Sequence, residues 1–122
     1  SVMEESKRQK QVAGVIQEEM NDIFLRMGLN MINGGMVSIA AVKVTPDLLE
    51  ARFYLSLFQV KDAEAVLAKI EDRKGEMRRQ LGERVKQQLR RVPELRFFKD
   101  DTLDHVFKME EIFKKINEER NK

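Results

Sequence analysis

The chain has 122 residues, of which 42% are hydrophobic and 36% are charged, and its formal net charge at pH 7 is +2. This length suits one folded domain, and the hydrophobic content argues against intrinsic disorder. Cysteine is absent, which excludes disulfides and thiolate metal sites, and no apolar run approaches the roughly 20 residues that span a bilayer. We therefore expect a soluble cytoplasmic protein with one domain over residues 6–122, after a disordered start at 1–5 whose first two residues look like a cloning remnant.

Positive charge is concentrated in the middle of the chain. Residues 69–99 contain 11 Lys and Arg against 5 Asp and Glu, whereas residues 1–68 contain 7 against 9 and residues 100–122 contain 5 against 7. A local positive excess is typical of surfaces that neutralise phosphate groups, although a solvated helix face gives the same count. Residues 69–99 are thus the candidate binding segment.

The first predicted element is a helix over residues 7–27, because apolar side chains recur there at steps of three and four. Ser6 and Gln9 can form a capping box at its start, and Gly28 can adopt the positive φ that ends a helix. Residues 29–35 contain two Asn and a Gly-Gly pair, which predicts a turn or a flexible loop.

Two strands are predicted next, on either side of a turn at residues 45–47. Residues 36–44 are rich in Val, Ile and Ala without helical spacing, and Thr-Pro-Asp at 45–47 favours a turn. Residues 50–58 alternate strictly between apolar and polar side chains, as expected for a half-buried strand. We therefore predict that these two strands pair antiparallel and that one face of the pair packs against the core.

The second half is predicted to contain two helices, a strand and a last helix. Asp62 can cap a helix that ends near residues 73–75, and a third helix carries the apolar stripe Met77, Leu81, Val85 and Leu89 until Pro93 stops it. Residues 95–99 are predicted as a third strand, in which Phe97 packs into the core. A final amphipathic helix is expected at about 102–117, followed by a polar tail.

The predicted fold class is therefore α+β, with the order α-β-β-α-α-β plus a C-terminal helix. Strands tend to follow strands and helices to follow helices, which is typical of this class. The helices should pack on one face of a three-stranded sheet.

The residues offer little for catalysis or for cofactor binding. His105 is the only histidine, and Asp100, Asp101 and Asp104 lack the spacing of a calcium loop, so helix capping explains them better. Neither a phosphate-binding GxxxxGK[ST] loop nor a GxGxxG fingerprint is present. We expect no enzyme activity, no metal and no cofactor.

The third predicted helix places several cations of the basic segment on one side. At 100° per residue, Arg79, Lys86 and Arg90 fall within roughly 40° of one another, opposite the apolar stripe, and Glu83 on the same ridge can pair with Arg79. Arginine suits bidentate contacts with phosphate. The candidate RNA-binding residues are Arg73, Lys74, Arg78, Arg79, Arg84, Lys86, Arg90 and Arg91.

Three stretches resemble the ribosome-binding factor A family of bacteria. They are RQKQVAGVIQEEMNDIF at residues 8–24, VTPDLLEARFYLSL at 44–57 and MRRQLGERVKQQLRRVPELRFFKDDTL at 77–103, which together extend over most of the chain. The element order is also similar to that of type II KH domains, although the GxxG loop of that RNA-binding module is absent.

The resemblance implies a non-catalytic, cytoplasmic, monomeric factor that binds the small ribosomal subunit and its 16S ribosomal RNA. It also implies a role in late subunit maturation, including processing of the 5′ end of the RNA, and a dependence at low temperature. Two stretches depart from the family pattern: Arg73-Lys74-Gly75 stands where the family has Ala-x-Gly, and residues 30–36 stand where relatives have a short charged loop.

Two other interpretations remain open at this point. The first is a general KH-like module for structured RNA with a different RNA client. The second is a protein-protein adaptor whose basic patch meets an acidic partner.

Overall fold

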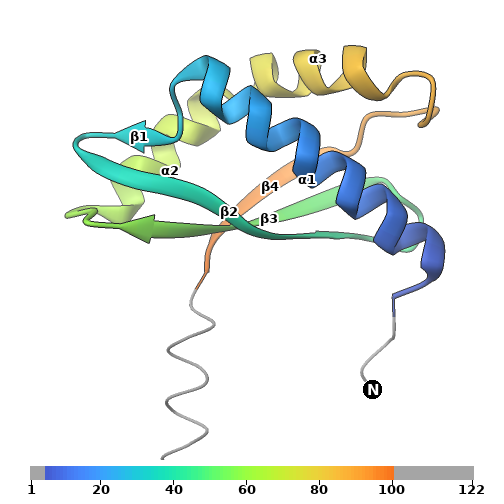
Figure 1. The fold of residues 1–122 in the computed structure, drawn as a ribbon, viewed down its shortest axis with the longest axis horizontal. Coiled ribbons are helices and arrows are strands. Elements are labelled where there is room, and N and C mark those ends of the chain that lie inside the picture. Colours follow the sequence, from blue (N-terminus) through green and yellow to red (C-terminus); the bar gives the residue numbers. More distant parts are fainter. Residues whose placement is uncertain (1–4, 101–122) are drawn as a thin grey trace, which may run out of the picture.

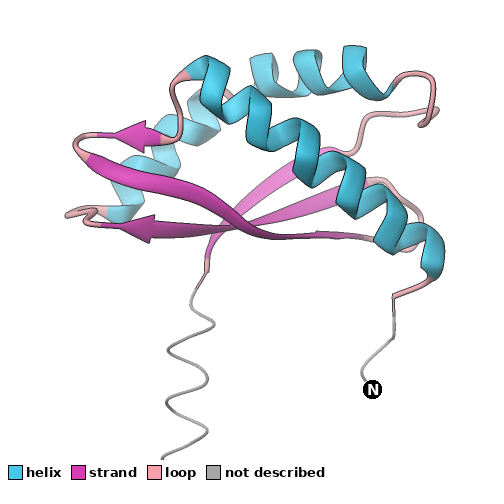
Figure 2. Ribbon diagram, viewed as in Figure 1, coloured by secondary structure: helices cyan, strands magenta, loops and turns pink. Residues whose placement is uncertain are grey.

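The computed structural model describes residues 5–100, and residues 1–4 and 101–122 lie outside this part. The elements follow the order α1 (Lys7–Met27), β1 (Met31–Ile32), β2 (Gly35–Val44), β3 (Glu50–Phe58), α2 (Ala63–Asp72), α3 (Lys74–Val85) and β4 (Glu94–Lys99) (Figure 2). Apart from β1, this is the predicted order. The last predicted helix, at about 102–117, lies outside the described residues.

The strands form one sheet in the order β1-β2-β3-β4, and α1, α2 and α3 all lie on the same side of it (Figure 1). β1, β2 and β3 are paired antiparallel, whereas β4 is parallel to β3. For the three helices within residues 5–100, the prediction that they lie on one face of the sheet is confirmed. None of the helices within residues 5–100 combines the length and the apolar character that crossing a membrane requires.

The prediction of a three-stranded sheet was wrong, because the segment assigned to a loop contains β1. Asn33 and Gly34 have φ angles of 53° and 82° and join β1 to β2 as a two-residue hairpin turn. An Asn-Gly pair favours this turn because both of its positions need positive φ. Of the two alternatives predicted for residues 29–35, the turn is therefore correct, and what was not predicted is the strand β1 that precedes it.

The capping interactions that begin and end α1 are those predicted. The Gln9 backbone N–H donates to Ser6 Oγ at 3.1 Å, and the Ser6 N–H donates to Gln9 Oε1 at 2.8 Å. Gly28 ends the helix with φ 72°. The buried Gln9 side chain also donates to the Val44 carbonyl at 3.0 Å, which fixes the start of α1 on β2.

The core lies between the helices and the inner face of the sheet. Phe53 is fully buried in β3, and Phe97 of β4 stacks on it with ring centroids 5.2 Å apart. Burial of such a ring stabilises the fold by about 1.5–3 kcal/mol. Phe98, the next residue along β4, points outward and is 40% exposed. The predicted core position of Phe97 is thus confirmed.

The predicted extent of the third helix was wrong. α3 ends at Val85, whose carbonyl accepts hydrogen bonds from the N–H groups of Gln88 and Leu89 in a closing turn. The chain must then return to the sheet, where the Glu94 N–H donates to the Leu49 carbonyl at 2.8 Å and places β4 beside β3. Arg90 therefore lies beyond α3, and the predicted helical ridge does not include it.

Candidate nucleic-acid interface

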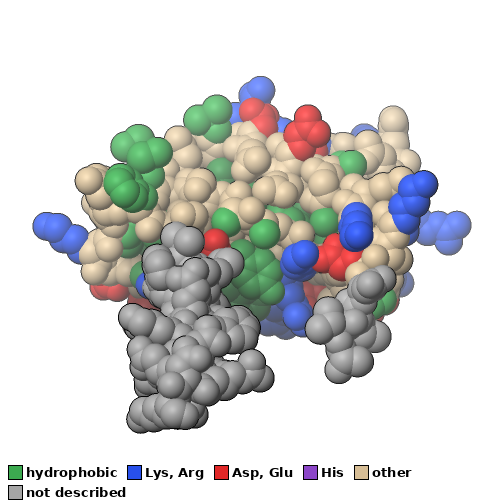
Figure 3. Space-filling view, turned by 60° about the horizontal axis from the view of Figure 1, so that its bottom comes forward, with side chains coloured by type: hydrophobic (Ala, Val, Ile, Leu, Met, Phe, Trp, Pro, Cys, Tyr) green, Lys and Arg blue, Asp and Glu red, His purple; other side chains and the backbone are tan. Residues whose placement is uncertain are grey.

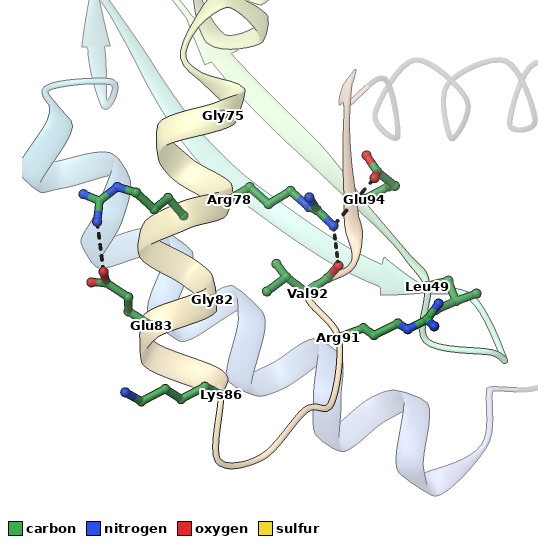
Figure 4. A pocket seen from close by; sticks show the side chains of 10 residues that line it. Leu49, Gly75, Arg78, Gly82, Glu83, Lys86, Arg91, Val92 and Glu94 are labelled. Carbon is green, nitrogen blue, oxygen red and sulfur yellow. Dashed lines mark hydrogen bonds and ion pairs between the residues drawn. The ribbon is translucent and has the colours of Figure 1, made fainter.

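An open groove of about 820 Å³ runs between α3 and the segment that leads into β4. Figure 4 shows its two walls, with Gly82 on α3 and Lys86 directly after its end on one side, and Arg91, Val92 and Glu94 on the opposite side. The complete lining is Leu49, Gly75, Arg78, Arg79, Gly82, Glu83, Lys86, Arg91, Val92 and Glu94. Four of these side chains are cationic and two are acidic, so the groove is positive.

Arg78 joins the two walls of the groove. Its guanidinium donates to the Val92 carbonyl at 2.9 Å and to the Pro93 carbonyl at 3.3 Å, and it lies 3.7 Å from the Glu94 carboxylate (Figure 4). Backbone carbonyls that face away from a sheet need a donor, and Arg78 supplies it. The side chain thus holds the entry to β4 against α3 and presents positive charge to the groove floor.

A second depression of about 420 Å³ continues the groove toward the start of α1. It shares Leu49 and Arg91 with the first and adds Arg90 and Arg8. Arg8 donates to the Gln88 carbonyl at 3.2 Å, which ties α1 to the turn after α3. Together, the groove and this depression form what we call the basic groove.

Lys86, Arg90 and Arg91 supply the available charge of the basic groove. All three side chains are exposed, and none of them makes a hydrogen bond or an ion pair with another residue of the described part. A cation without an internal partner keeps its full charge for a ligand, and phosphate oxygens are suitable acceptors. These residues therefore fit an anionic partner better than Arg78, Arg79 and Arg84, whose guanidiniums already have partners.

Arg79 is already neutralised by two carboxylates. It contacts Glu76 at 2.5 Å and Glu83 at 2.9 Å, one turn before and one turn after it on α3. The hydrogen bonds from Arg79, with a further one from Gln80, lower the pKa of Glu76 to about 2. Glu83 was expected to compensate part of the charge, and Glu76 compensates more.

Arg84 belongs to the interior side of α3 and not to the basic groove. Its guanidinium donates to Asp22 at 2.7 Å and to Glu19 at 3.1 Å, both on α1. The hydrogen bonds from Arg84 and Arg26 hold the pKa of Asp22 below its usual value. The structure thus gives Arg84 a role in packing α3 on α1.

The remaining predicted cations, Arg73 and Lys74, lie at the α2–α3 junction. Lys74 pairs with Glu71 at 2.6 Å. Arg73 lines a separate depression with Lys69, near the β1 hairpin. Residues at this junction are therefore not brought together with Lys86 and Arg91.

Arg8 and Gly82 are two groove residues that the sequence reasoning missed. Arg8 is distant in sequence from the basic segment, and only the packing of α1 on the turn after α3 brings it there. At Gly82, a Cβ atom would lie 2.8 Å from Val92 Cγ2, so a glycine lets the two walls approach. Gly82 has no charged side chain that could have marked it as a groove residue. A glycine inside a predicted helix nevertheless indicates that another segment of the chain approaches the helix closely there.

The groove chemistry is that of anion binding. Within residues 5–100, no three His, Cys, Asp or Glu side chains are grouped as metal ligands would be. Arginine and lysine side chains around an open, elongated groove can neutralise several phosphates at once, which gives a salt-dependent affinity. The arrangement therefore suits a nucleic-acid backbone.

Residues 8–113 match the family model described as ribosome-binding factor A. The chain is 39% identical to ribosome-binding factor A of Cytophaga hutchinsonii over 112 residues, which is 92% of this chain and 84% of that protein.

Two structures show the same fold. The crystal structure of ribosome-binding factor A from Thermus thermophilus superposes with a TM-score of 0.63 at 16% identity, over 75% of this chain and 94% of that one. The second, with a TM-score of 0.52 at 19% identity, is a Thermus thermophilus homology model of that factor fitted into a cryo-EM map of a 30S complex, and it matches 78% of this chain and 93% of that one. The family match and the identity to the curated relative show that this chain belongs to the ribosome-binding factor A family.

Proposed function

We propose that this chain binds the small ribosomal subunit through the basic groove and contacts the backbone of its 16S ribosomal RNA. The observation that carries the proposal is the set of unpartnered cations, Lys86, Arg90 and Arg91, around an elongated groove. Family membership supports the choice of partner, because the related Thermus thermophilus factor was fitted into a 30S complex. The partner is therefore a folded RNA within a particle.

The proposed role is assistance in late subunit maturation, including processing of the 5′ end of the RNA, without catalysis by the chain itself. A protein that binds one arrangement of an RNA more tightly than another shifts the population toward it, and this requires no reacting group. We infer a cytoplasmic monomer of type II KH-like architecture for this role. The α-β-β-α-α-β order of the longer elements supports that assignment.

Sedimentation with isolated small subunits, large subunits and intact ribosomes tests the partner. We expect co-sedimentation with small subunits only, weakened by Lys86→Glu. Lys61→Glu is the matched control, because Lys61 is an exposed cation outside the groove and the substitution changes the net charge equally. Equal binding to all three particles would instead indicate a module for another RNA client.

The 5′-end role needs a separate measurement. Cells without the protein, grown at low temperature, should accumulate 16S RNA with an unprocessed 5′ end, and the wild-type chain should restore the mature end better than Lys86→Glu does. Normal ends in the deletion strain would remove the processing role and leave the binding proposal intact.

A further inference from the structure

The outer face of the sheet, away from the helices, carries its side chains in rows that cross the strands. One row is cationic, because Lys43 of β2 is paired with Arg52 of β3, and Arg52 with Arg96 of β4. The next row along the same face is aromatic, because Tyr54 of β3 is paired with Phe98 of β4. We call these two rows the outer-face platform.

The two rings of the aromatic row are stacked and partly exposed. The rings of Tyr54 and Phe98 stack with centroids 5.6 Å apart and an angle of 25° between their planes. Phe98 is 40% exposed and Tyr54 is half-buried, so each ring keeps open surface. Figure 3, which brings the side away from the helices forward, shows hydrophobic side chains directly beside Lys, Arg and acidic side chains.

The cations of this row form ion pairs with acidic residues, but these pairs do not neutralise all of their charge. The Glu50 carboxylate accepts from Nε of both Arg52 and Arg96, and Lys43 pairs with Glu5 at 2.6 Å. Glu50 engages both arginines at Nε, and the Arg96 side chain remains 60% exposed. The hydrogen bond from Arg52 to Glu50 raises the pKa of Arg52. Arg52 also lies two residues before Tyr54 on the same face of β3, which brings the cationic row beside the aromatic row.

We propose that the outer-face platform is a second nucleic-acid site, which takes unpaired RNA by stacking a base on Tyr54 and Phe98 while Arg52 and Arg96 contact the adjoining phosphates. Aromatic rings on a sheet with nearby cations suit single strands, because every base has a stacking face and the backbone is anionic. A duplex keeps its bases stacked inside and cannot use the rings.

The charge on this face argues against a purely apolar occupant. A hydrophobic helix laid across Tyr54 and Phe98 would also cover part of the adjacent row and remove Arg52 and Arg96 from water. Desolvated guanidiniums sharing one carboxylate, Glu50, are unfavourable. An anionic ligand with flat apolar groups satisfies both rows at once.

Tyr54 is an intrinsic reporter for this site, because the chain has one tyrosine and no tryptophan. We expect single-stranded oligoadenylate RNA of roughly eight nucleotides to quench the tyrosine emission of the full chain in a saturable manner. A duplex of equal length should leave the emission nearly unchanged.

Substitutions on the platform separate stacking from general attraction. Phe98→Leu keeps an apolar side chain and should weaken binding of labelled oligoadenylate by about 5- to 100-fold. Met36→Leu is the control, because Met36 is an exposed apolar residue of the same face with no aromatic ring. Thermal unfolding of each variant should match that of the wild type, which excludes loss of folding as the cause.

Three outcomes would overturn the inference. One is oligoadenylate binding without a change in Tyr54 emission, and another is equal affinity of Phe98→Leu and wild type. The third is a tyrosine that acrylamide cannot reach in the free protein and that RNA does not affect, since protein would then cover the face. Because Lys86→Glu should leave the Tyr54 response intact, failure of subunit binding alone would overturn the proposed function and not this inference.

Discussion

Cations lie on both flanks of α3, but the two flanks use them differently. On the side facing α1, Arg84 is held by Asp22 and Glu19, so its charge stabilises the packing of two helices. On the groove side and beyond the helix end, Lys86 and Arg91 have no partner within the described residues. The comparison teaches that a count of positive residues overestimates a binding surface, because carboxylates on other elements neutralise part of it.

The largest expected effect comes from reversing the free charges of the basic groove. Lys86→Glu, Arg90→Glu and Arg91→Glu together should lower affinity for small subunits by about 100-fold. The slope of log affinity against log salt should fall by roughly one for each phosphate that the variant no longer neutralises. Binding titrations at several salt concentrations measure both quantities. An unchanged slope would move the RNA-binding surface away from this side of the molecule.

Closing the groove is the next largest effect. Gly82→Leu places a side chain where a Cβ atom alone would lie 2.8 Å from Val92, so we expect the free energy of unfolding to fall by about 1–3 kcal/mol and subunit binding to weaken. Denaturant unfolding measures the first. The control is Gly75→Ala on the same helix, where no atom lies within 4 Å and the better helix former should stabilise slightly.

Removing the interior cation should affect stability alone. Arg84→Met keeps the aliphatic stem but cannot form either ion pair with α1, and we expect the free energy of unfolding to fall by about 1 kcal/mol. Affinity for small subunits should stay within about twofold of wild type, because the charge that is removed does not face the groove. A large drop in affinity for a stably folded variant would show that both flanks of α3 bind RNA.

The smallest expected effect concerns pH. The pKa of Glu76 is lowered from 4.5 to about 2, chiefly by Arg79, so its contribution to stability is present above pH 4.5 and is lost as pH falls toward 2. Glu76→Gln should therefore unfold with a slightly weaker pH dependence over that range. Thermal unfolding at several pH values would detect this difference. If the variant and the wild type showed the same pH dependence of stability, the ion pair with Arg79 would make no contribution to stability in solution.

Sequence periodicity predicted most of the fold because local rules governed it. The capping box at Ser6, the end of α1 at Gly28 and the alternation in β3 each depend on neighbouring residues. One error was local, because β1 belongs to the short Asn33-Gly34 hairpin. The other arose where the chain connects distant parts. α3 ends early because residues 86–93 must return to β3, and no local signal before Pro93 marks that turn.

The candidate site was harder to predict than the fold. Helical spacing grouped Arg79 with Lys86 and Glu83, and the three-residue step from Glu76 to Arg79 was a local signal that was not used. It could not show that Arg84 contacts α1. Arg8 joined the groove only through tertiary packing. The outer-face aromatic row needed the parallel register of β3 and β4, which sequence alone did not provide.

The parallel pairing of β4 with β3 also has a consequence for how the protein folds during its synthesis. Leu95 and Phe97 complete the core, yet they are made after α2 and α3 and must return to lie beside a strand formed much earlier. Pairings between distant segments form slowly because a long loop must close first. A nascent chain that has not yet released residue 99 from the exit tunnel therefore cannot close its core, so the domain should become protease-resistant only after residue 99 has emerged.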